Sequence, residues 1–508
     1  MPTIKVETIL TRGVVPTVPG ADSIAIACGR IFAVGSDAEV APLAGVATKT
    51  IDLAGRAVLP GFIDAHTHFL QLGLAEIGFR IDLIGLSKED ALDRLNNVAR
   101  ERGAGGWVVG LGWDESRWRD RRPFCREDLD RIAVDRPLIA VRLDGHLLIA
   151  NTAALKRVPP TIPAAEIDAT HGVLREEAAF ALLRTLSPDR ETLREALYAA
   201  AAYAQRLGIT SVHAMLPPDL NAYMRERGRL PLRVTLCPEV SALEPLAALG
   251  VTSGFGDDWL RIGGIGEIFA DGSIGAGNAA LGEPYADSGE RGELNYSAQE
   301  ITSLIERAEQ AGIQTVIHAI GDRAITQVLD AHAAVQTSPD LRHRIEHFEL
   351  PTLEQIERAG ELSLSISMQP NFVGNWSGEE KMYQKRLGKE RDSQIDPHRL
   401  VVDRGIPLAF GSDCMPISPL YGIHWAVNAP HSSQRLSVEE AIFCYTEAGA
   451  RLSFEEKEKG RIEAGMLADL VVLDQDPRED QSRISERTVE MTILNGKIVY
   501  QRGNEPCE

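Results

Sequence analysis

Short apolar runs, typical of buried strands in a parallel sheet, recur along the chain between segments that are longer and richer in charge. Seven such runs follow residue 200, and an eighth lies at residues 58–66. They are VLPGFIDAH (58–66), ITSVHA (209–214), LRVTLCPE (232–239), IGGIGEIFAD (262–271), IQTVIHA (313–319), RHRIEHF (342–348), LSLSISMQ (362–369) and IPLAFGSD (406–413). Each run is short enough for one strand, so the pattern predicts eight strands.

The segments between these runs carry apolar residues at helical spacing. SAQEITSLIERAEQAG (297–312) and PTLEQIERAG (351–360) are examples, and we expect Gly312 and Gly360 to cap the two helices. Eight strands alternating with helices indicate an α/β fold, a TIM-type (β/α)8 barrel. Its functional residues should lie at the carboxyl ends of the strands.

Two further regions stand outside the eight repeats. Residues 70–206 separate the first strand from the second, which is too long for a loop, and they contain strand-like runs at 107–118 and 137–151. We expect an inserted subdomain that overhangs the active site. Both ends of the chain, 1–57 and 461–508, are rich in short β-type runs and should form one small β-sandwich, which leaves 58–460 for the barrel.

Composition narrows the choice of partner. The chain has 508 residues and a formal charge of −20, from 53 basic and 73 acidic residues. Nucleic acid and anionic membranes need a basic surface, so this charge argues against both and favours a small-molecule substrate. A homodimer is a common assembly for such folds. No signal peptide or membrane-spanning run is evident, and six cysteines without CxxC spacing indicate reduced thiols, so we expect a cytoplasmic protein.

The most informative motif is the pair His66 and His68 at the end of the first predicted strand. Residues two apart on a strand point to one face, and imidazole is a good ligand for zinc and similar metals. The 12 histidines in 508 residues give roughly 0.3 His-x-His pairs by chance, so the motif needs its context.

That context comes from the ends of the other strands. Glu267 lies in the fourth, and His318, His347 and Asp413 end the fifth, sixth and eighth. Barrels gather their functional groups at these ends. Imidazoles together with carboxylates suit zinc, or manganese, iron, cobalt or nickel, so the sequence predicts a divalent metal site for one or two ions.

Several motifs together resemble the amidohydrolase superfamily over essentially the whole chain. They are GFIDAHTHF (61–69), VIHAIGD (316–322), RIEH (344–347), FGSD (410–413) and GMLADLVVLD (465–474). FADGSIGAGNAAL (269–281), GWDESRW (112–118) and DGHLLIANTAAL (144–155) are similar to the group that contains N-substituted formamide deformylases. The resemblance implies a metal-dependent hydrolase with a β-sandwich flank, in which one or two metals activate water.

One position departs from that resemblance. Many two-metal members of the superfamily carry a carboxylated lysine in the fourth strand, but this chain has no lysine between Lys156 and Lys381. Glu267 is the natural substitute, because a carboxylate can bridge two cations without modification. The alternative is that Glu267 forms a buried ion pair and the site holds one metal.

The remaining histidines are weaker candidates. His343 lies four residues before His347 on the same strand, too far away to share a metal, so we expect a structural role. The resemblance suggests that His146 reaches substrate from the insertion, with a structural role as the alternative. His213 ends the second strand and can contact substrate or support a ligand.

Three other features of the sequence are candidates for a place at the site. Trp113 and Asp114 can line the pocket, although such residues commonly serve packing. Cys414 follows Asp413, and a buried inert thiol is favoured over a nucleophile because activated water removes the need for one. The charge run 378–392 predicts a solvated loop or helix, or a lid.

The predicted chemistry is hydrolysis by metal-activated water. His66, His68, His318 and His347 hold metal, Glu267 bridges two ions if two are present, and Asp413 acts as ligand and general base. The substrate is an amide-type C–N bond (N-acyl, N-formyl, carbamate or urea) or an ester. The alternatives are a deaminase or decarboxylase of the same superfamily, or a catalytically silent binding protein. The deaminases usually carry a catalytic glutamate after the fifth strand, and AIGDRAITQ (319–327) has none.

Overall fold

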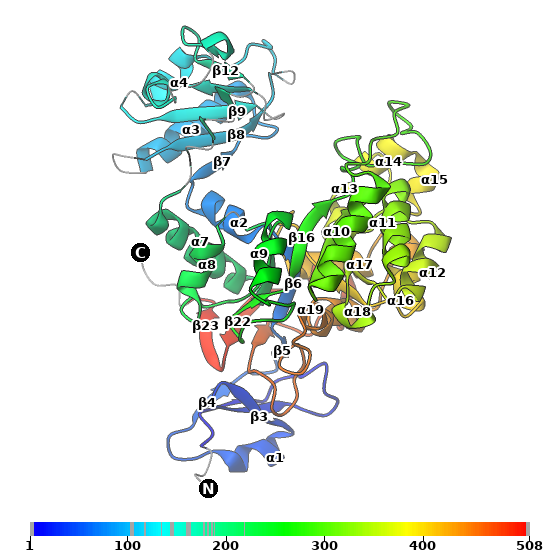
Figure 1. Ribbon diagram of the computed structural model, residues 1–508. Helices are drawn as coiled ribbons and strands as arrows, with labels where there is room; N and C mark the ends of the chain where they lie inside the picture. Colours follow the sequence, from blue (N-terminus) through cyan, green and yellow to red (C-terminus); the bar gives the residue numbers. More distant parts are fainter. Residues whose placement is uncertain are drawn as a thin grey trace. The chain divides into compact units, whose positions relative to one another are not determined.

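The computed structural model describes residues 5–503 except 102–105, 116–117, 134, 143–146, 159–163, 176–177, 180–181, 184–185, 187 and 218. The chain divides into two compact units (Figure 1). Unit 1 comprises residues 1–69 and 201–508, and unit 2 comprises residues 70–200. The predicted domain boundaries, and the predicted overhang of the insertion, stay predictions.

Every predicted strand segment of unit 1 contains a strand. One sheet has the order β15-β14-β13-β6 and the other the order β16-β17-β18-β19-β20, and all pairs in both are parallel. The strands are β6 (Phe62–Thr67), β13 (Ile209–Met215), β14 (Arg233–Cys237), β15 (Leu260–Ile262), β16 (Gly264–Phe269), β17 (Gln314–Ala319), β18 (Arg344–His347), β19 (Ser365–Met368) and β20 (Leu408–Phe410).

The two parallel sheets meet without forming one continuous ladder. Gly266 N–H of β16 donates to Pro238 O, just after β14, at 2.9 Å, and Asp413 N–H, just after β20, donates to His66 O of β6 at 2.8 Å, so backbone bonds connect the two sheets. Unit 1 therefore has the TIM-type α/β fold, but the described strands do not close into the single barrel sheet that the sequence predicted.

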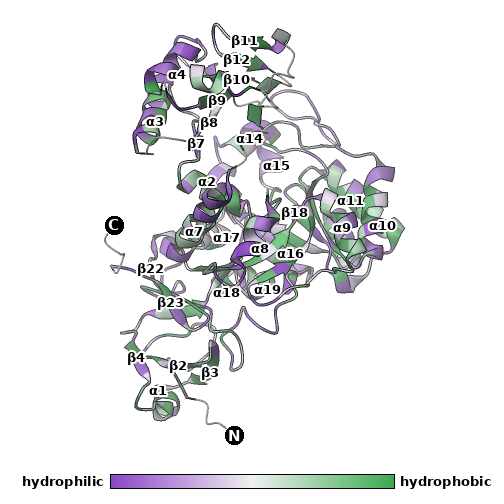
Figure 2. Cartoon of the chain, turned by 60° about the vertical axis from the view of Figure 1, so that its left-hand side comes forward, coloured by the Kyte–Doolittle hydropathy of each residue, from purple (hydrophilic) through white to green (hydrophobic). Residues whose placement is uncertain are grey.

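Amphipathic helices follow the strands of unit 1. Four buried residues of α10 (Ala298–Gln310) follow helical spacing: Ile301, Leu304, Ile305 and Ala308. Figure 2 shows both hydrophobic and hydrophilic residues along this helix. Gly312 follows the C-cap residue Ala311, but the prediction for Gly360 was wrong, because α12 continues past it to Glu361.

Apart from α11, which has 14 residues, the other α-helices that follow β13 in unit 1 are short, and several belong to the long connections after β19 and β20. They are α8 (Leu220–Glu226), α9 (Leu243–Ala248), α11 (Asp322–Val335), α12 (Leu353–Glu361), α13 (Pro370–Trp376), α14 (Met382–Leu387), α15 (Lys389–Asp392), α16 (His398–Asp403), α17 (Pro419–Val427), α18 (Val438–Cys444) and α19 (Glu447–Leu452). In Figure 1, α10, α11 and α12 lie side by side. None of the helices in the described part of the chain has the length and apolar character needed to span a bilayer.

Two small antiparallel-rich sheets are built from the ends of the chain. The first contains β1 (Thr8–Thr11), β2 (Ser23–Ala27), β3 (Arg30–Gly35) and β4 (Lys49–Asp52). The second contains β5 (Ala57–Pro60), β21 (Leu470–Leu473), β22 (Val489–Leu494) and β23 (Lys497–Gln501). One hydrophobic cluster includes residues of both sheets, such as Ile24, Ile26, Leu470 and Ile493.

Unit 2 has its own six-stranded sheet, of order β11-β12-β10-β9-β8-β7. Its strands are β7 (Arg80–Asp82), β8 (Val108–Trp113), β9 (Leu138–Arg142), β10 (Leu147–Ala150), β11 (Ile167–Asp168) and β12 (Val173–Arg175). Its helices include most of α2 (Phe69–Glu76), α3 (Lys88–Glu101), α4 (Arg126–Ile132) and the first part of α7 (Arg190–Arg206). Successive residues of β9 enter two different hydrophobic clusters, Leu138 and Ala140 in one, Ile139 and Val141 in the other. The continuous apolar runs therefore reflect burial of both faces of this sheet.

Candidate metal centre

The polar residues at the strand ends of unit 1 converge around Glu267. Its Oε2 lies 3.5 Å from His66 Nε2 and 3.9 Å from His68 Nε2. Its Oε1 lies 2.8 Å from His318 Nδ1 and 2.9 Å from His347 Nε2. Each oxygen of this one carboxylate thus faces a different pair of imidazoles.

The backbone of β16 explains how the side chain of Glu267 reaches this position. The register between β16 and β17 shifts between Ile265 and Ile268. Gly266 has φ +151°, and a Cβ atom there would lie 2.1 Å from Val316 O of β17. A bulge re-aims the side chain next to it, so the glycine permits the close approach that brings Glu267 into the cluster.

Asp413 approaches the same cluster from β20. Its Oδ1 lies 3.2 Å from His68 Nε2 and 3.7 Å from His66 Nε2. Two groups can hold a metal ion, His66 with His68 and Asp413, and His66 with Glu267 and His347, and the ligand atoms of each lie within 4.8 Å of one another.

Two buried atoms of this cluster fit a cation. His66 Nε2 and Asp413 Oδ1 have no hydrogen-bond partner within the described ranges. A buried polar atom without a partner is costly, and imidazole nitrogen with carboxylate oxygen is the donor set that zinc and similar ions take. The residues present therefore fit a divalent metal.

A buried ion pair fixes the orientation of His66. His66 Nδ1 lies 2.7 Å from Glu346 Oε2, and Arg344 Nε donates to Glu346 Oε1 at 2.7 Å. Arg344 also donates to Ala65 O at 2.8 Å. Because Glu346 engages Nδ1, Nε2 of His66 is left to face the cluster, as in many metal-binding histidines.

Two more histidines of the cluster, His318 and His347, are also held through their second ring nitrogen. His347 Nδ1 lies 2.8 Å from Gln369 Oε1, and His318 Nε2 lies 3.0 Å from Gly272 O. Each ring therefore directs one nitrogen toward Glu267, while its other nitrogen contacts a protein oxygen atom.

The electrostatics of the cluster favour ionised carboxylates. Burial raises the pKa of Glu267, but the charge of His66 and hydrogen bonds with His318 and His347 outweigh it and hold the pKa well below its ordinary value. Burial likewise raises the pKa of Asp413, but the close contact with His68 and the positive charge of the neighbouring histidines outweigh burial and leave the pKa lowered. At neutral pH the centre therefore offers two anionic ligands.

A cavity of about 180 Å³ opens beside the cluster. Its wall is mostly apolar and includes Ile274, Phe372, Trp376, Met382 and Met415. The cavity also includes His68, Glu267, Phe269, Ser273, Gly275, His318, Ile320, His347, Glu349, Tyr383 and Asp413.

Glu349 and Tyr383 form a polar pair in the wall of this cavity. Tyr383 donates its hydroxyl hydrogen to Glu349 Oε2 at 2.8 Å, and both residues are buried. Burial raises the pKa of Glu349 to about 7, although the hydrogen bond from Tyr383 opposes this. Neither residue was predicted. His347 and Glu349 are two residues apart, as His66 and His68 are, so the same spacing was a signal in the sequence. The strand ends at His347, however, because His347 and Phe348 have positive φ angles, and Glu349 therefore lies beyond the strand.

Two of the three predicted substrate-binding residues are among the described residues. Trp113 is buried in the core of unit 2, where its Nε1–H donates to Ala140 O at 3.0 Å. His213 is buried at the end of β13, and Arg344 lies 3.0 Å from its Nδ1. His146 lies outside the described residues.

Other predicted features also have clear positions. His343 lies 2.9 Å from Glu309 and 2.8 Å from Thr315 Oγ1, which gives it a structural place. Burial raises the pKa of the Cys414 thiol, so it is a poor nucleophile. The charge run 378–392 is not wholly solvated, because Tyr383 and Asp392 are buried.

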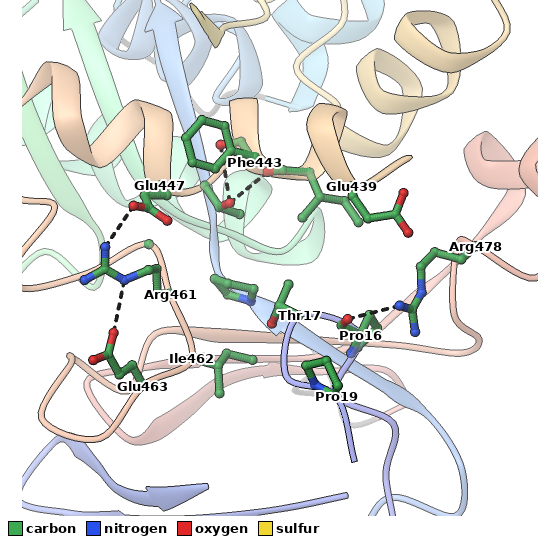
Figure 3. Close-up of a pocket in the computed structure, with 14 residues that line it drawn as sticks. Pro16, Thr17, Pro19, Glu439, Phe443, Glu447, Arg461, Ile462, Glu463 and Arg478 are labelled. Carbon is green, nitrogen blue, oxygen red and sulfur yellow. Dashed lines mark hydrogen bonds and ion pairs between the residues drawn. The ribbon is translucent and has the colours of Figure 1, made fainter. Parts of the chain in front are cut away.

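A larger cavity, about 490 Å³, lies in unit 1 beside Pro16, Phe443 and Ile462. Figure 3 shows Arg461 between Glu447 and Glu463, at 2.8 and 3.2 Å, and Arg478 reaching Pro16 O at 3.0 Å. Its arginines are thus already paired, and its lining holds no histidine among the described residues. The smaller cavity, which contains the cluster, is therefore the candidate site.

Known proteins resemble this chain over nearly its full length. A model of the Amidohydrolase family matches residues 49–500. The putative amidohydrolase YtcJ of Bacillus subtilis is 31% identical, with 90% of this chain and 91% of that protein covered. The N-substituted formamide deformylase of Arthrobacter pascens is 27% identical over 95% of each chain. The solved structure of an uncharacterised metal-dependent hydrolase from Pyrococcus furiosus matches with a TM-score of 0.79 and 30% identity, covering 93% of this chain and 99% of that one.

Proposed function

Because this chain belongs to the amidohydrolase family, and is a metal-dependent hydrolase, we propose that it cleaves an amide-type C–N bond or an ester of a small molecule. The amide-type candidates are N-acyl, N-formyl, carbamate and urea groups. The arrangement of imidazoles around the two oxygens of Glu267 is the observation that carries the proposal.

We assign the ligands from that arrangement. His66, His68 and Asp413 would hold one ion, and His318 and His347 would hold a second. Glu267 would lie between the two, since its Oε2 faces His66 and His68 and its Oε1 faces His318 and His347. Zinc is the first choice for this donor set. The carboxylate would thus take the bridging place for which many two-metal members of the superfamily use a modified lysine.

The reaction needs a base close to the attacking water. When bound, a divalent ion supplies positive charge that polarises a carbonyl group and makes water more acidic. Asp413 is placed to take the proton, because its Oδ1 is buried beside His68 and has no hydrogen-bond partner in the described part of the chain. The same carboxyl group can then give the proton to the leaving nitrogen or oxygen.

Metal content per chain tests the assignment. Wild type, Glu267→Ala and the control Glu354→Ala, an exposed position on α12, would be loaded with zinc, desalted and analysed by mass spectrometry for the metal. We expect about two ions per chain in wild type and the control, and fewer in Glu267→Ala. One ion in all three proteins would refute the bridge.

Hydrolysis is measured on the same samples. A generic ester and a set of N-formyl, N-acyl and carbamate substrates would be tested before and after treatment with a chelator. We expect turnover of at least one class, lost on metal removal and restored by zinc. Turnover that survives complete metal removal would contradict the proposed chemistry.

A further inference from the structure

The cavity beside the cluster has an aromatic wall that begins at a proposed ligand. The ring of Phe372 stacks on His347, with centroids 6.0 Å apart and an interplanar angle of 8°. Trp376 lies 4.6 Å from Phe372, and Tyr383 lies 5.9 Å from Trp376, measured between centroids. A flat apolar group that entered the cavity would find ring surface along this row.

The size of the cavity limits that group. Its volume is about 180 Å³, and an engineered apolar cavity of about 150 Å³ binds benzene. The space therefore suits one ring-sized substituent together with the reacting group, rather than a long chain or a polymer.

The wall of the cavity has few charged groups, and those outside the proposed ligands are acidic. Apart from the proposed ligands, Glu349 is the charged side chain in the lining, and no lysine or arginine occurs among the described lining residues. A substrate carboxylate in this wall would lose its water without gaining a cation, which is costly. The wall therefore disfavours anionic substituents.

Glu349 is held as a hydrogen-bond acceptor. Tyr383 donates to Oε2, and Oε1 receives no hydrogen bond from the described residues. A carboxyl group keeps accepting capacity whether or not it is protonated. A substrate N–H or O–H group that enters the cavity can therefore find an acceptor there.

We propose that Glu349, held by Tyr383, is a specificity-determining residue that accepts a hydrogen bond from the substrate, and that the row Phe372, Trp376 and Tyr383 selects an uncharged, ring-sized substituent. The substrate class is then a small neutral aromatic or cyclic compound with an N–H or O–H donor beside the scissile group. This inference rests on the proposed function, because it takes the neighbouring cluster as the reacting centre.

Binding of three matched probes to the zinc-loaded full chain tests the inference by calorimetry, which needs no turnover. Benzamide carries a ring and a donor, methyl benzoate lacks the donor, and 4-carboxybenzamide adds a distal charge. We expect benzamide to bind about tenfold or more tighter than each of the other two. Equal affinities, tighter binding of the charged probe, or no binding of benzamide would overturn the inference.

Variants assign the preference to Glu349. Glu349→Met removes the acceptor at similar length, and the double variant Glu349→Met/Tyr383→Phe also removes the hydroxyl left without its partner. Glu354→Met is the matched control on exposed α12. In whichever Glu349 variant folds, we expect the affinity for benzamide divided by the affinity for methyl benzoate to fall to about one, with the metal content per chain unchanged. An unchanged ratio in a folded variant would overturn the role of Glu349.

The outcome also separates this inference from the proposed function. Selective binding of benzamide without hydrolysis of any amide or ester would leave the cavity chemistry standing and remove the reaction. Hydrolysis without selectivity among the three probes would support the proposed function and overturn the inference about the cavity.

Discussion

Replacing Glu346 by glutamine separates two roles of one buried carboxylate. Glu346 is fully buried and accepts hydrogen bonds at 2.7 Å from His66 Nδ1 and from Arg344 Nε. Glutamine keeps the shape but removes the charge. The substitution therefore weakens the hold on His66 and leaves Arg344 without its carboxylate.

The two effects have different sizes and different readouts. Loss of a carboxylate behind a metal-binding histidine typically costs 10–100-fold in metal affinity, which is about 1.4–2.8 kcal/mol. Breaking a buried ion pair on one side typically costs about 3–5 kcal/mol in the free energy of unfolding, because the remaining charge stays buried. Arg344 is itself almost fully buried, so the larger figure applies.

A double variant distinguishes these effects. In Arg344→Met/Glu346→Gln the uncompensated charge is gone, so we expect most of the unfolding free energy to return while metal affinity stays low. Denaturant unfolding of metal-free protein gives the first quantity, and competition with a chromogenic zinc chelator gives the second. Wild-type metal affinity in folded Glu346→Gln would refute the reasoning that Glu346 orients His66.

Three further changes have defined outcomes. Asp413→Asn should retain most of the bound metal but lose about 100- to 10,000-fold in turnover, and metal analysis beside steady-state kinetics would show whether turnover instead survives. Burial lowers the pKa of His398 to about 4, below the unfolded value, so the unfolded state takes up the proton first. The free energy of unfolding should therefore fall by about 3 kcal/mol between pH 6.5 and 4, and equal pH slopes of denaturant unfolding in wild type and His398→Gln would argue against this. Gly266→Ala would place a Cβ atom 2.1 Å from Val316 O, so it should lower both stability and zinc content, whereas Gly465→Ala, with φ +94° but open space, should cost only about 1–3 kcal/mol of backbone strain. Equal zinc loss in both glycine variants would contradict the role of the close approach.

The strands of unit 1 could be predicted because buried parallel strands are continuous apolar runs. The exception is instructive. The run at 58–66 predicts one strand, but the structure has two, β5 and β6, which belong to different sheets and are separated by Gly61. Pro60 and Gly61 inside the run were the signal, since both interrupt strand pairing.

The proposed ligands could be predicted because each lies within three residues of the carboxyl end of a strand, where sequence and position in the fold are directly linked. The wall of the cavity could not. Phe372, Trp376 and Tyr383 lie on two short helices after β19, and their approach to His347 depends on how that connection folds back. Similarly, the sequence does not show that the ring of Trp113 packs in the core of unit 2, because that packing depends on how the helices of unit 2 cover its sheet.

The pairing of β5 with β21 determines how late in synthesis β6, the strand that carries His66, can be stabilised through its neighbour β5. Leu59 and Val471 are partners in that ladder, and β5 leads within two residues into β6 and His66. During synthesis, β5 has no such partner until the ribosome has passed residue 473, because domains assemble as their segments emerge. We therefore expect the strand that carries His66, and His68 directly after it, to be among the last parts of the centre to become rigid, and chains cut short before β21 to lack a stable metal site.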